Sequence, residues 1–217
     1  MKKVIGIVLA GGAGTRFGGS KPKQYYLING KEMIWYSIDA FKKANQVDDF
    51  IVVLDKEEYV NGRIRDDYNV KTVLGGATRN WSFKNALDYI KENFPHCEKI
   101  IENNAACPFT TSELLDEYIK ILDDYDYVHT TFKITDALGS YNDRTVNRED
   151  YFLIQAPDAY RFDMLYNCFD PNHPNGHPAA QLPAEAKGYN YFDYKIKFKV
   201  THPEDIKIAE MLINEIK

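Results

Sequence analysis

The chain has 217 residues, of which 44% are hydrophobic and 27% are charged, and its formal net charge is −5. This composition is typical of an ordinary globular protein, and the length suits one domain with an excursion. The acidic balance argues against a nucleic-acid-binding protein, which usually carries a basic surplus. No apolar run reaches the roughly 20 residues that cross a bilayer, and no signal peptide is evident, so we expect a cytoplasmic protein without membrane contact.

An apolar run at residues 4–9 predicts a buried first strand, and a loop rich in glycine and lysine follows it. The loop contains three closely spaced glycines, Gly11, Gly12 and Gly14. Such glycines let backbone N–H groups form a concave phosphate site, and Arg16 and Lys23 add positive charge. The spacing matches neither the dinucleotide fingerprint nor the P-loop. A structural turn explains the glycines alone, whereas a nucleoside triphosphate explains the glycines and the cations together.

Strand and helix signals alternate along the chain, which predicts a doubly wound α/β sandwich with a mainly parallel sheet. We expect further strands at residues 50–54, 70–74, 99–101, 127–132, 152–155 and 191–200. We expect helices at residues 33–44, 80–94 and 162–168, a helix after a capping box at 110–113, and a last helix capped by Thr201. The polar stretch at 133–150 lacks helical periodicity and is predicted to be a protruding two-stranded arm of a single domain that covers residues 1–217.

The glycine loop and the Pro-Lys-Gln-Tyr element at residues 22–25 resemble the signature of the methylerythritol-phosphate and ribitol-phosphate cytidylyltransferases. The resemblance implies transfer of CMP from CTP to a polyol phosphate, with release of pyrophosphate. It implies that Arg16 and Lys23 contact the triphosphate as catalytic cations. It also implies nucleotide contacts from the loop backbone, at Ala10, Gly11, Gly12 and Gly14.

A second block, at residues 75–87, resembles the segment with which this family recognises cytosine. The matching residues are Gly76, Arg79 and Ser82, which the resemblance implies are nucleotide-binding. Discrimination of a pyrimidine needs short polar groups that are held rigidly, here at a strand-to-helix turn. An ordinary turn would explain the glycines but not the whole spacing.

A third block, at residues 103–109, keeps the family's Ala-Ala-x-Pro-Phe frame but changes its polar residues. Ala105 is retained and is expected to contact the nucleotide. Asn104 stands where the family has an aspartate that helps to hold Mg²⁺, so it offers the metal only a neutral oxygen. The metal then rests on the triphosphate, on Asn104, or on another acid such as Glu102 or Asp193.

The acceptor residues depart further from the family pattern. Cys107 stands where an arginine contacts the acceptor, and it is either a reactive thiol or a small buried residue. Lys199 matches a lysine near the α-phosphate, whereas Ile196 replaces a metal-binding aspartate. Arg148 matches an arginine that reaches the acceptor from the arm of a neighbouring subunit, so we expect a homodimer. Because Cys107 and Ala137 both lack the family's acceptor contacts, we expect an acceptor other than methylerythritol phosphate or ribitol phosphate.

Two alternatives stay open on the sequence. One is a hexose-phosphate nucleotidylyltransferase that uses another nucleoside triphosphate, and the other is a relative that binds nucleotide without turnover. The three cysteines and five histidines show no recognised spacing, so the sequence predicts neither a disulfide framework nor a zinc site. We expect an Mg²⁺-dependent enzyme whose partners are CTP and a small phosphorylated or phosphonylated acceptor.

Overall fold

The computed structural model describes residues 2–12, 17–19, 21–143, 145–196 and 198–216. The strands are β1 (Val4–Ala10), β2 (Leu27–Ile28), β3 (Lys31–Glu32), β4 (Asp49–Leu54), β5 (Lys71–Leu74), β6 (Lys99–Asn104), β7 (Tyr127–Lys133), β8 (Phe152–Arg161) and β9 (Gly188–Tyr191). The α-helices are α1 (Met33–Lys43), α2 (Lys56–Asn61), α3 (Arg63–Tyr68), α4 (Arg79–Asn93), α5 (Ser112–Ile121), α6 (Phe162–Cys168) and α7 (Asp205–Ile216). Short 3-10 helices are η1 (Lys23–Tyr25), η2 (Arg148–Asp150) and η3 (Pro178–Gln181).

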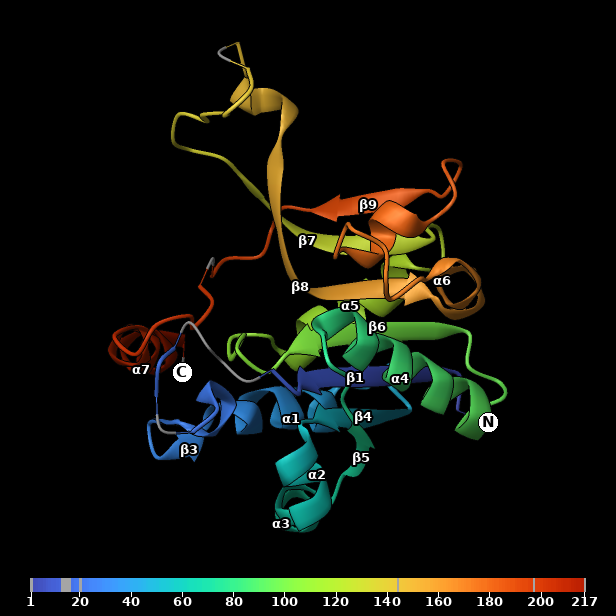
Figure 1. Cartoon of the computed structure of the whole chain (residues 1–217), viewed down its shortest axis with the longest axis vertical. Coiled ribbons are helices and arrows are strands. Elements are labelled where there is room, and N and C mark those ends of the chain that lie inside the picture. Colours follow the sequence, from blue (N-terminus) through green and yellow to red (C-terminus); the bar gives the residue numbers. More distant parts are fainter. Residues whose placement is uncertain (1, 13–16, 20, 144, 197, 217) are drawn as a thin grey trace.

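Seven strands form one sheet in the order β5-β4-β1-β6-β8-β7-β9 (Figure 1). β1 pairs in parallel with β4 and β6, and β5 and β9 join in parallel at the two edges. β8 runs antiparallel to both of its neighbours, β6 and β7. The predicted α/β fold with a mainly parallel sheet is therefore confirmed, and β8 is the strand that makes the sheet mixed.

Side chains of β1 alternate between two apolar cores, as expected for a strand that is buried on both faces. Val8 and Ala10 join the core that α1, α5 and α7 cover, whereas Ile7 and Leu9 join the core that α4 and α6 cover. Helices thus cover both faces of the sheet, and the three-layer sandwich follows from this alternation. Among the described residues, no helix is long and apolar enough to cross a bilayer.

The predicted arm rises from the sheet between β7 and β8 (Figure 1). Its stem is the antiparallel pairing of residues 131–133 with residues 152–154. Farther out, the described residues at 134–143 and 145–147 carry no strand, and only η2 forms near the tip. The arm is therefore a loop on a two-stranded stem rather than a hairpin throughout. Local bonds replace the ladder, since the Ser140 hydroxyl accepts from two following backbone N–H groups.

Two predicted segments near the C-terminus have different bounds in the structure. The strand expected at 191–200 is wrong beyond its first residue, because β9 ends at Tyr191 and the described residues from there to α7 carry no strand. The last helix starts at Asp205 and is not capped by Thr201. Instead the Asp205 carboxylate accepts from the backbone N–H groups of Thr201 and His202, at 2.7 and 2.8 Å.

The structure also adds short helices that the hydrophobic pattern did not predict. α2 and α3 have six residues each, which is too short to show helical periodicity. Asp55 caps α2 by accepting from two backbone N–H groups. The cap of α5 is Thr111 rather than Thr110, and its hydroxyl accepts from Leu114 N.

Candidate active site

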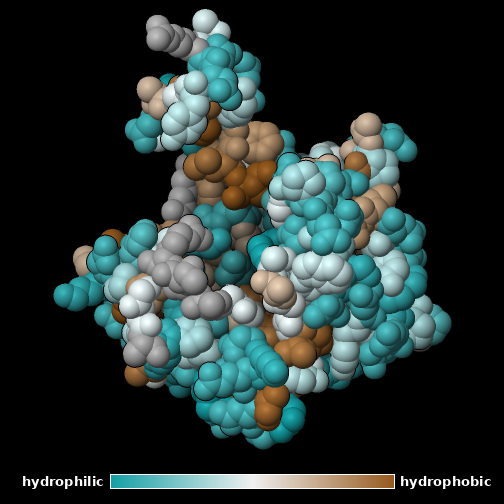
Figure 2. Space-filling model, in the orientation of Figure 1, coloured by the Kyte–Doolittle hydropathy of each residue, from teal (hydrophilic) through white to brown (hydrophobic). Residues whose placement is uncertain are grey.

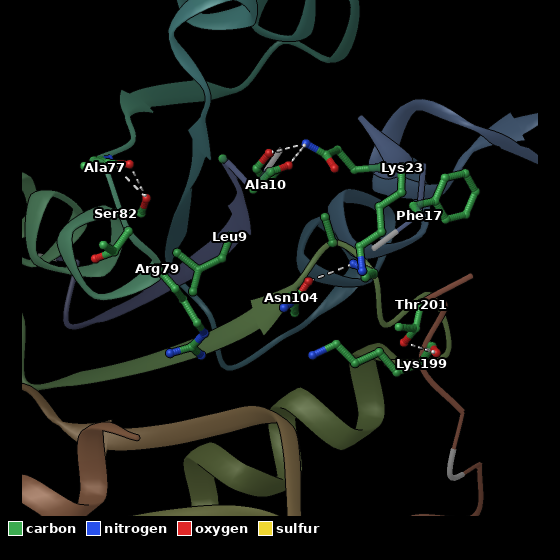
Figure 3. A pocket seen from close by; sticks show the side chains of 17 residues that line it. Leu9, Ala10, Phe17, Lys23, Ala77, Arg79, Ser82, Asn104, Lys199 and Thr201 are labelled. Atoms are coloured by element: carbon green, nitrogen blue, oxygen red, sulfur yellow. Dashed lines mark hydrogen bonds between the residues drawn. The ribbon is translucent and has the colours of Figure 1, made fainter. Parts of the chain in front are cut away.

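A cavity of about 430 Å³ lies where the carboxyl ends of β1, β5 and β6 meet at one edge of the sheet. Segments far apart in the chain line it: the loop after β1 with η1, the turn into α4, the end of β6, and the strip before α7. Figure 3 shows these segments around the cavity. The predicted site residues that line it are Ala10, Gly11, Gly12, Lys23, Gly76, Arg79, Ser82, Asn104, Ala105 and Lys199.

The start of the glycine-rich loop after β1 is held by the buried amide of Gln24. The Nε2 atom of Gln24 donates to the carbonyl oxygens of Ala10 and Gly12, at 2.5 and 3.2 Å. These bonds hold the first residues of the loop in one arrangement. Gly14 and Arg16, which the resemblance assigned to the triphosphate, lie outside the described residues.

The turn between β5 and α4 requires glycine at position 76. A Cβ atom there would lie 2.4 Å from the Cβ of Trp81, far inside the normal contact distance. Gly76 N donates to Ser82 Oγ at 3.0 Å, and Thr78 caps α4 by accepting from Trp81 N. Ser82 therefore lines the cavity and also holds the Gly76 peptide, which makes this polar edge rigid.

The orientation of Asn104 is set by the peptide that follows it. Its Oδ1 atom accepts from Ala106 N at 3.0 Å, so the amide oxygen faces the backbone. The amide nitrogen is then the group that Asn104 offers to a ligand in the cavity. A donor at this position suits an anionic ligand better than a metal cation.

Lys23 and Lys199 bring positive charge to the cavity from opposite ends of the chain. Lys23 Nζ donates to Val200 O at 2.9 Å, and Val200 N donates to Ala106 O at 3.1 Å. These two bonds attach the strip before α7 to η1 and to the end of β6. They determine where Lys199 enters the cavity, and its amine points toward the cavity centre (Figure 3).

Arg79, the first residue of α4, reaches a buried acid on the neighbouring strand. Its Nη2 atom donates to Glu102 Oε1 at 2.5 Å, and the Glu102 side chain has no exposed surface. Burial raises the pKa of the Glu102 carboxyl, while the Arg79 guanidinium lowers it. The ion pair fixes Arg79 at the wall of the cavity.

A second cavity, of about 210 Å³, extends from the first toward β8. The two cavities share Arg79, Asn104 and Lys199. Asp158 and His177 are among the further residues that line the second cavity. The two cavities therefore meet at two cationic side chains and one amide. A phosphate bound at this junction would occupy part of each cavity.

The described residues of the main cavity do not fit a metal ion held by protein carboxylates. No aspartate or glutamate among them lines the cavity, and Mg²⁺ favours such ligands. Asn104 uses its oxygen for Ala106 N, and Glu102 is buried against Arg79. Asp193 is exposed and lines neither cavity. Glu102 and Asp193, the two acids considered from the sequence as alternative metal ligands, therefore do not supply a carboxylate to the main cavity.

Comparison with known proteins assigns the chain to a family. The family model of 2-C-methyl-D-erythritol 4-phosphate cytidylyltransferase matches residues 4–215. The chain belongs to this cytidylyltransferase family. It is 30% identical to the member from Azobacteroides pseudotrichonymphae genomovar. CFP2, over 99% of this chain and 100% of the relative. It is 28% identical to the member from Clostridium botulinum strain 657, over 100% of both chains.

Solved structures of cytidylyltransferases share the fold. The 4-diphosphocytidyl-2C-methyl-D-erythritol synthase of Anaerococcus prevotii DSM 20548 superposes with a TM-score of 0.79 and 21% identity, over 98% of this chain and 96% of that one. The 2-C-methyl-D-erythritol 4-phosphate cytidylyltransferase of Thermus thermophilus gives 0.76 and 18%, over 96% and 98%. Family membership makes the chain a CTP-dependent nucleotidyltransferase, as the glycine loop and the second block predicted.

Two predicted acceptor residues of this cytidylyltransferase line neither of the two cavities. Cys107 is fully buried, its Sγ atom is 3.6 Å from the donor Gln155 Nε2, and burial raises the pKa of its thiol. Of the two interpretations of Cys107, the structure favours a small buried residue. Arg148 lies on the arm, where its Nη1 atom donates to Thr135 O at 2.5 Å. In the structure described, Arg148 therefore lines neither cavity of its own chain.

Three polar residues line the cytidylyltransferase cavity although the motif analysis did not select them: Gln24, Thr78 and Thr201. Gln24 belongs to the Pro-Lys-Gln-Tyr element, so the motif contained it without showing that its side chain holds Ala10 and Gly12. A threonine directly before a helical pattern is a recognised cap signal, and this signal could have identified Thr78. Thr201 was predicted to cap the last helix, so it was not considered as a cavity residue beside Lys199.

We expect one rapidly reacting thiol per native chain. Cys97 and Cys107 are buried, and burial raises the pKa of Cys97 to about 12, whereas Cys168 is partly exposed. Titration with a disulfide reagent at pH 8 should give about one fast equivalent, and the remaining thiols should react only after denaturation. Cys168→Ser should remove the fast equivalent. A fast equivalent that survives Cys168→Ser and disappears in Cys107→Ser would contradict the buried interpretation.

Proposed function

We propose that this chain is a single-domain enzyme that transfers CMP from CTP to a small acceptor bearing a phosphate or a phosphonate. The observation that carries the proposal is the charge of the main cavity: Lys23, Arg79 and Lys199 line it, and none of its described lining residues is an acid. Such a cavity favours a polyanion. The rigid turn that holds Gly76 and Ser82 adds a polar edge of the kind that pyrimidine recognition needs.

In the proposed reaction, an oxygen of the acceptor phosphate attacks the α-phosphorus of CTP. The new P–O bond forms as the bond to the bridging oxygen breaks, and pyrophosphate leaves with the electron pair. Catalysis then rests on positioning and on electrostatic stabilisation of the charge that accumulates around the α-phosphorus. We assign Lys199, which both cavities share, to the α-phosphate and the acceptor, and Lys23 to the pyrophosphate. Any Mg²⁺ is proposed to arrive with the triphosphate, and no step depends on a protein-held metal.

A pyrophosphate-release assay tests this proposal. Each ribonucleoside triphosphate is offered with a panel of polyol phosphates, phosphonates and hexose phosphates. We expect release with CTP and a matching acceptor, and little with the other nucleotides. Preferred use of UTP with a hexose phosphate would favour the hexose-phosphate alternative. CTP binding without release, across the panel, would favour a relative without turnover.

We propose further that the acceptor is neither 2-C-methyl-D-erythritol 4-phosphate, for which the relatives are named, nor ribitol phosphate. Cys107 cannot replace an arginine contact because it is buried, and the carboxylate of Asp158 lines the second cavity. One arginine–phosphate hydrogen bond is worth roughly 1.5–3 kcal/mol, or about 10- to 100-fold in binding. We expect kcat/KM for both polyol phosphates to lie well below about 10⁴ M⁻¹s⁻¹. Turnover of either compound at or above that value would contradict the proposal.

We propose that the arm mediates a homodimer. The stem of the arm and the start of the segment after β9 expose large apolar side chains. Figure 2 shows this apolar surface below the arm tip. These side chains are Tyr151, Phe152, Leu153, Ile154 and Phe192. We expect light scattering to give a dimer at micromolar concentration and Leu153→Glu to give monomers with reduced turnover. Met211→Glu, at an exposed apolar residue on α7, should leave the dimer intact. A fully active wild-type monomer would contradict the proposal.

A further inference from the structure

Three polar side chains converge beside the second cavity, away from the phosphate loop. They are His129 on β7, Asp158 on β8 and His177 in the segment before η3, and their ligand atoms all lie within 4.8 Å of one another. The side chains of His129 and Asp158 are 6% and 3% exposed, and that of His177 is 26% exposed. Two members of the cluster are therefore buried, and the third, His177, is partly exposed at the second cavity.

The sheet register places this cluster at the end of a row of charged groups. Glu102 on β6 lies directly opposite Asp158 on β8, and Asp158 lies directly opposite His129 on β7. Two buried carboxylates in directly opposed positions repel each other and are costly unless positive charge compensates both. Arg79 compensates Glu102 through its ion pair. Asp158 requires a second positive charge, and the two histidines are the groups that face it.

The two distances between Asp158 and the histidines, each to a different carboxylate oxygen, are longer than direct hydrogen bonds. His129 Nδ1 lies 3.5 Å from Asp158 Oδ1, and His177 Nε2 lies 3.4 Å from Asp158 Oδ2. N–H···O hydrogen bonds usually span about 2.7–3.2 Å. Among the described residues, His129 Nδ1, Asp158 Oδ1 and His177 Nε2 have no hydrogen-bond partner. Two ligands at the usual zinc distances of about 2.0–2.2 Å, at a tetrahedral angle, are about 3.3–3.5 Å apart.

We propose that His129, Asp158 and His177 form a binding site for a divalent transition metal of the zinc class. Imidazole nitrogen and carboxylate oxygen are ligands that zinc accepts, and three protein ligands leave a position open. Because Asp158 and His177 line the second cavity, that position faces the space that Arg79 and Lys199 also line. The open position would take water or an anionic oxygen of a bound ligand. None of the three ligands lines the main cavity, and the test of the metal site does not depend on the transfer reaction.

The experiment uses the full-length chain without a histidine tag. The protein is stripped with a chelator, dialysed, and titrated with Zn²⁺, with metal content read by mass spectrometry and stability read by thermal unfolding. We expect one Zn²⁺ per chain and a higher Tm on binding. Substitution with Co²⁺ should give the visible absorption of a low-coordinate nitrogen and oxygen site, without a thiolate charge-transfer band. Such a band would instead indicate a cysteine ligand and would overturn the assignment.

Variants separate this site from incidental binding to surface histidines. His177→Ala removes the ligand at the cavity, and Asp158→Asn keeps the volume but removes the charge. Loss of outer-shell partners alone weakens metal binding about 10- to 100-fold, so each ligand variant should weaken Zn²⁺ binding at least about 100-fold. His173→Ala replaces an exposed histidine of the same segment and should leave the Zn²⁺ affinity unchanged.

The comparison is made on variants whose Tm without metal shows that they are folded. If Asp158→Asn does not fold, His177→Ala carries the test, since His177 is partly exposed. The proposal is overturned if the wild-type chain binds no Zn²⁺ at micromolar concentration. It is equally overturned if folded His177→Ala retains the wild-type affinity, or if His173→Ala loses as much affinity as His177→Ala.

Discussion

Lys23→Ala should lower kcat at least about 10²-fold while CTP binding weakens much less. Lys23 lines the main cavity and is half-buried, so its ammonium acts on bound anions in a partly desolvated space. Loss of one positioned group that stabilises developing charge costs about 10²–10³ in turnover. The expected pattern is a fall in kcat with a modest rise in KM for CTP, because the charge at the pyrophosphate increases mainly in the transition state.

The matched control for this prediction is Lys21→Ala. Lys21 lies two residues earlier in the same loop, is exposed, and stands over the ring of Tyr26 outside the main cavity. We expect its removal to change kcat by less than a few-fold. Lys23 also holds Val200 O, so a Lys23→Met variant that keeps the aliphatic stem shows whether lost packing contributes. Near wild-type turnover in both Lys23 variants would contradict the assignment.

The first two sequence blocks were predictable as local units because the residues of each block are close together along the chain, and the structure places both blocks at one cavity. Gly11 and Gly12 follow a strand, and Gly76 and Ser82 lie six residues apart around a helix start, so short motifs contain the whole geometry. Lys199 is different, since the bonds that hold its segment at the cavity join Val200 to Lys23 and Ala106, which are distant in the chain. No local pattern contains those contacts, and only the family resemblance assigned Lys199.

The features that sequence reasoning missed depend on register or on competition between local and long-range bonds. Residues 191–200 alternate like a strand, but the strip after Tyr191 bonds to the end of β6 and to η1 instead of continuing β9. The outer arm has the composition of a hairpin, yet Ser140 satisfies its backbone locally. The proposed metal ligands are spread over three segments: the pairing of β7 with β8 brings His129 to Asp158, and the segment before η3 brings His177. Histidine spacing in the sequence contains no trace of this pairing.

Arg79→Met should destabilise the protein by about 3–5 kcal/mol at pH 8, apart from its effect on activity. Arg79 is the direct ion-pair partner of Glu102, whose side chain is fully buried and faces Asp158 across the sheet. Removing the partner of a buried carboxylate leaves its charge uncompensated, and such losses reach this size. Urea unfolding, followed by tryptophan fluorescence and circular dichroism, measures the difference in the free energy of unfolding. Arg161→Met is the matched control, because Arg161 is as exposed as Arg79 but its partner Asp126 is 25% exposed. That variant should lose no more than about 1 kcal/mol.

The pH dependence and a double variant separate lost charge compensation from lost packing. Burial already raises the pKa of Glu102 above its ordinary value, and removal of Arg79 should raise it further. A carboxyl whose pKa is higher in the folded state than in the unfolded state destabilises the fold as pH rises through the folded value. The loss in the free energy of unfolding caused by Arg79→Met should therefore be larger at pH 8 than at pH 5. Adding Glu102→Gln removes the buried charge, so the double variant should recover most of the lost stability at pH 8 and show little pH dependence. A deficit that is equal at both pH values and unchanged by Glu102→Gln would mean that Arg79 stabilises the fold through packing alone.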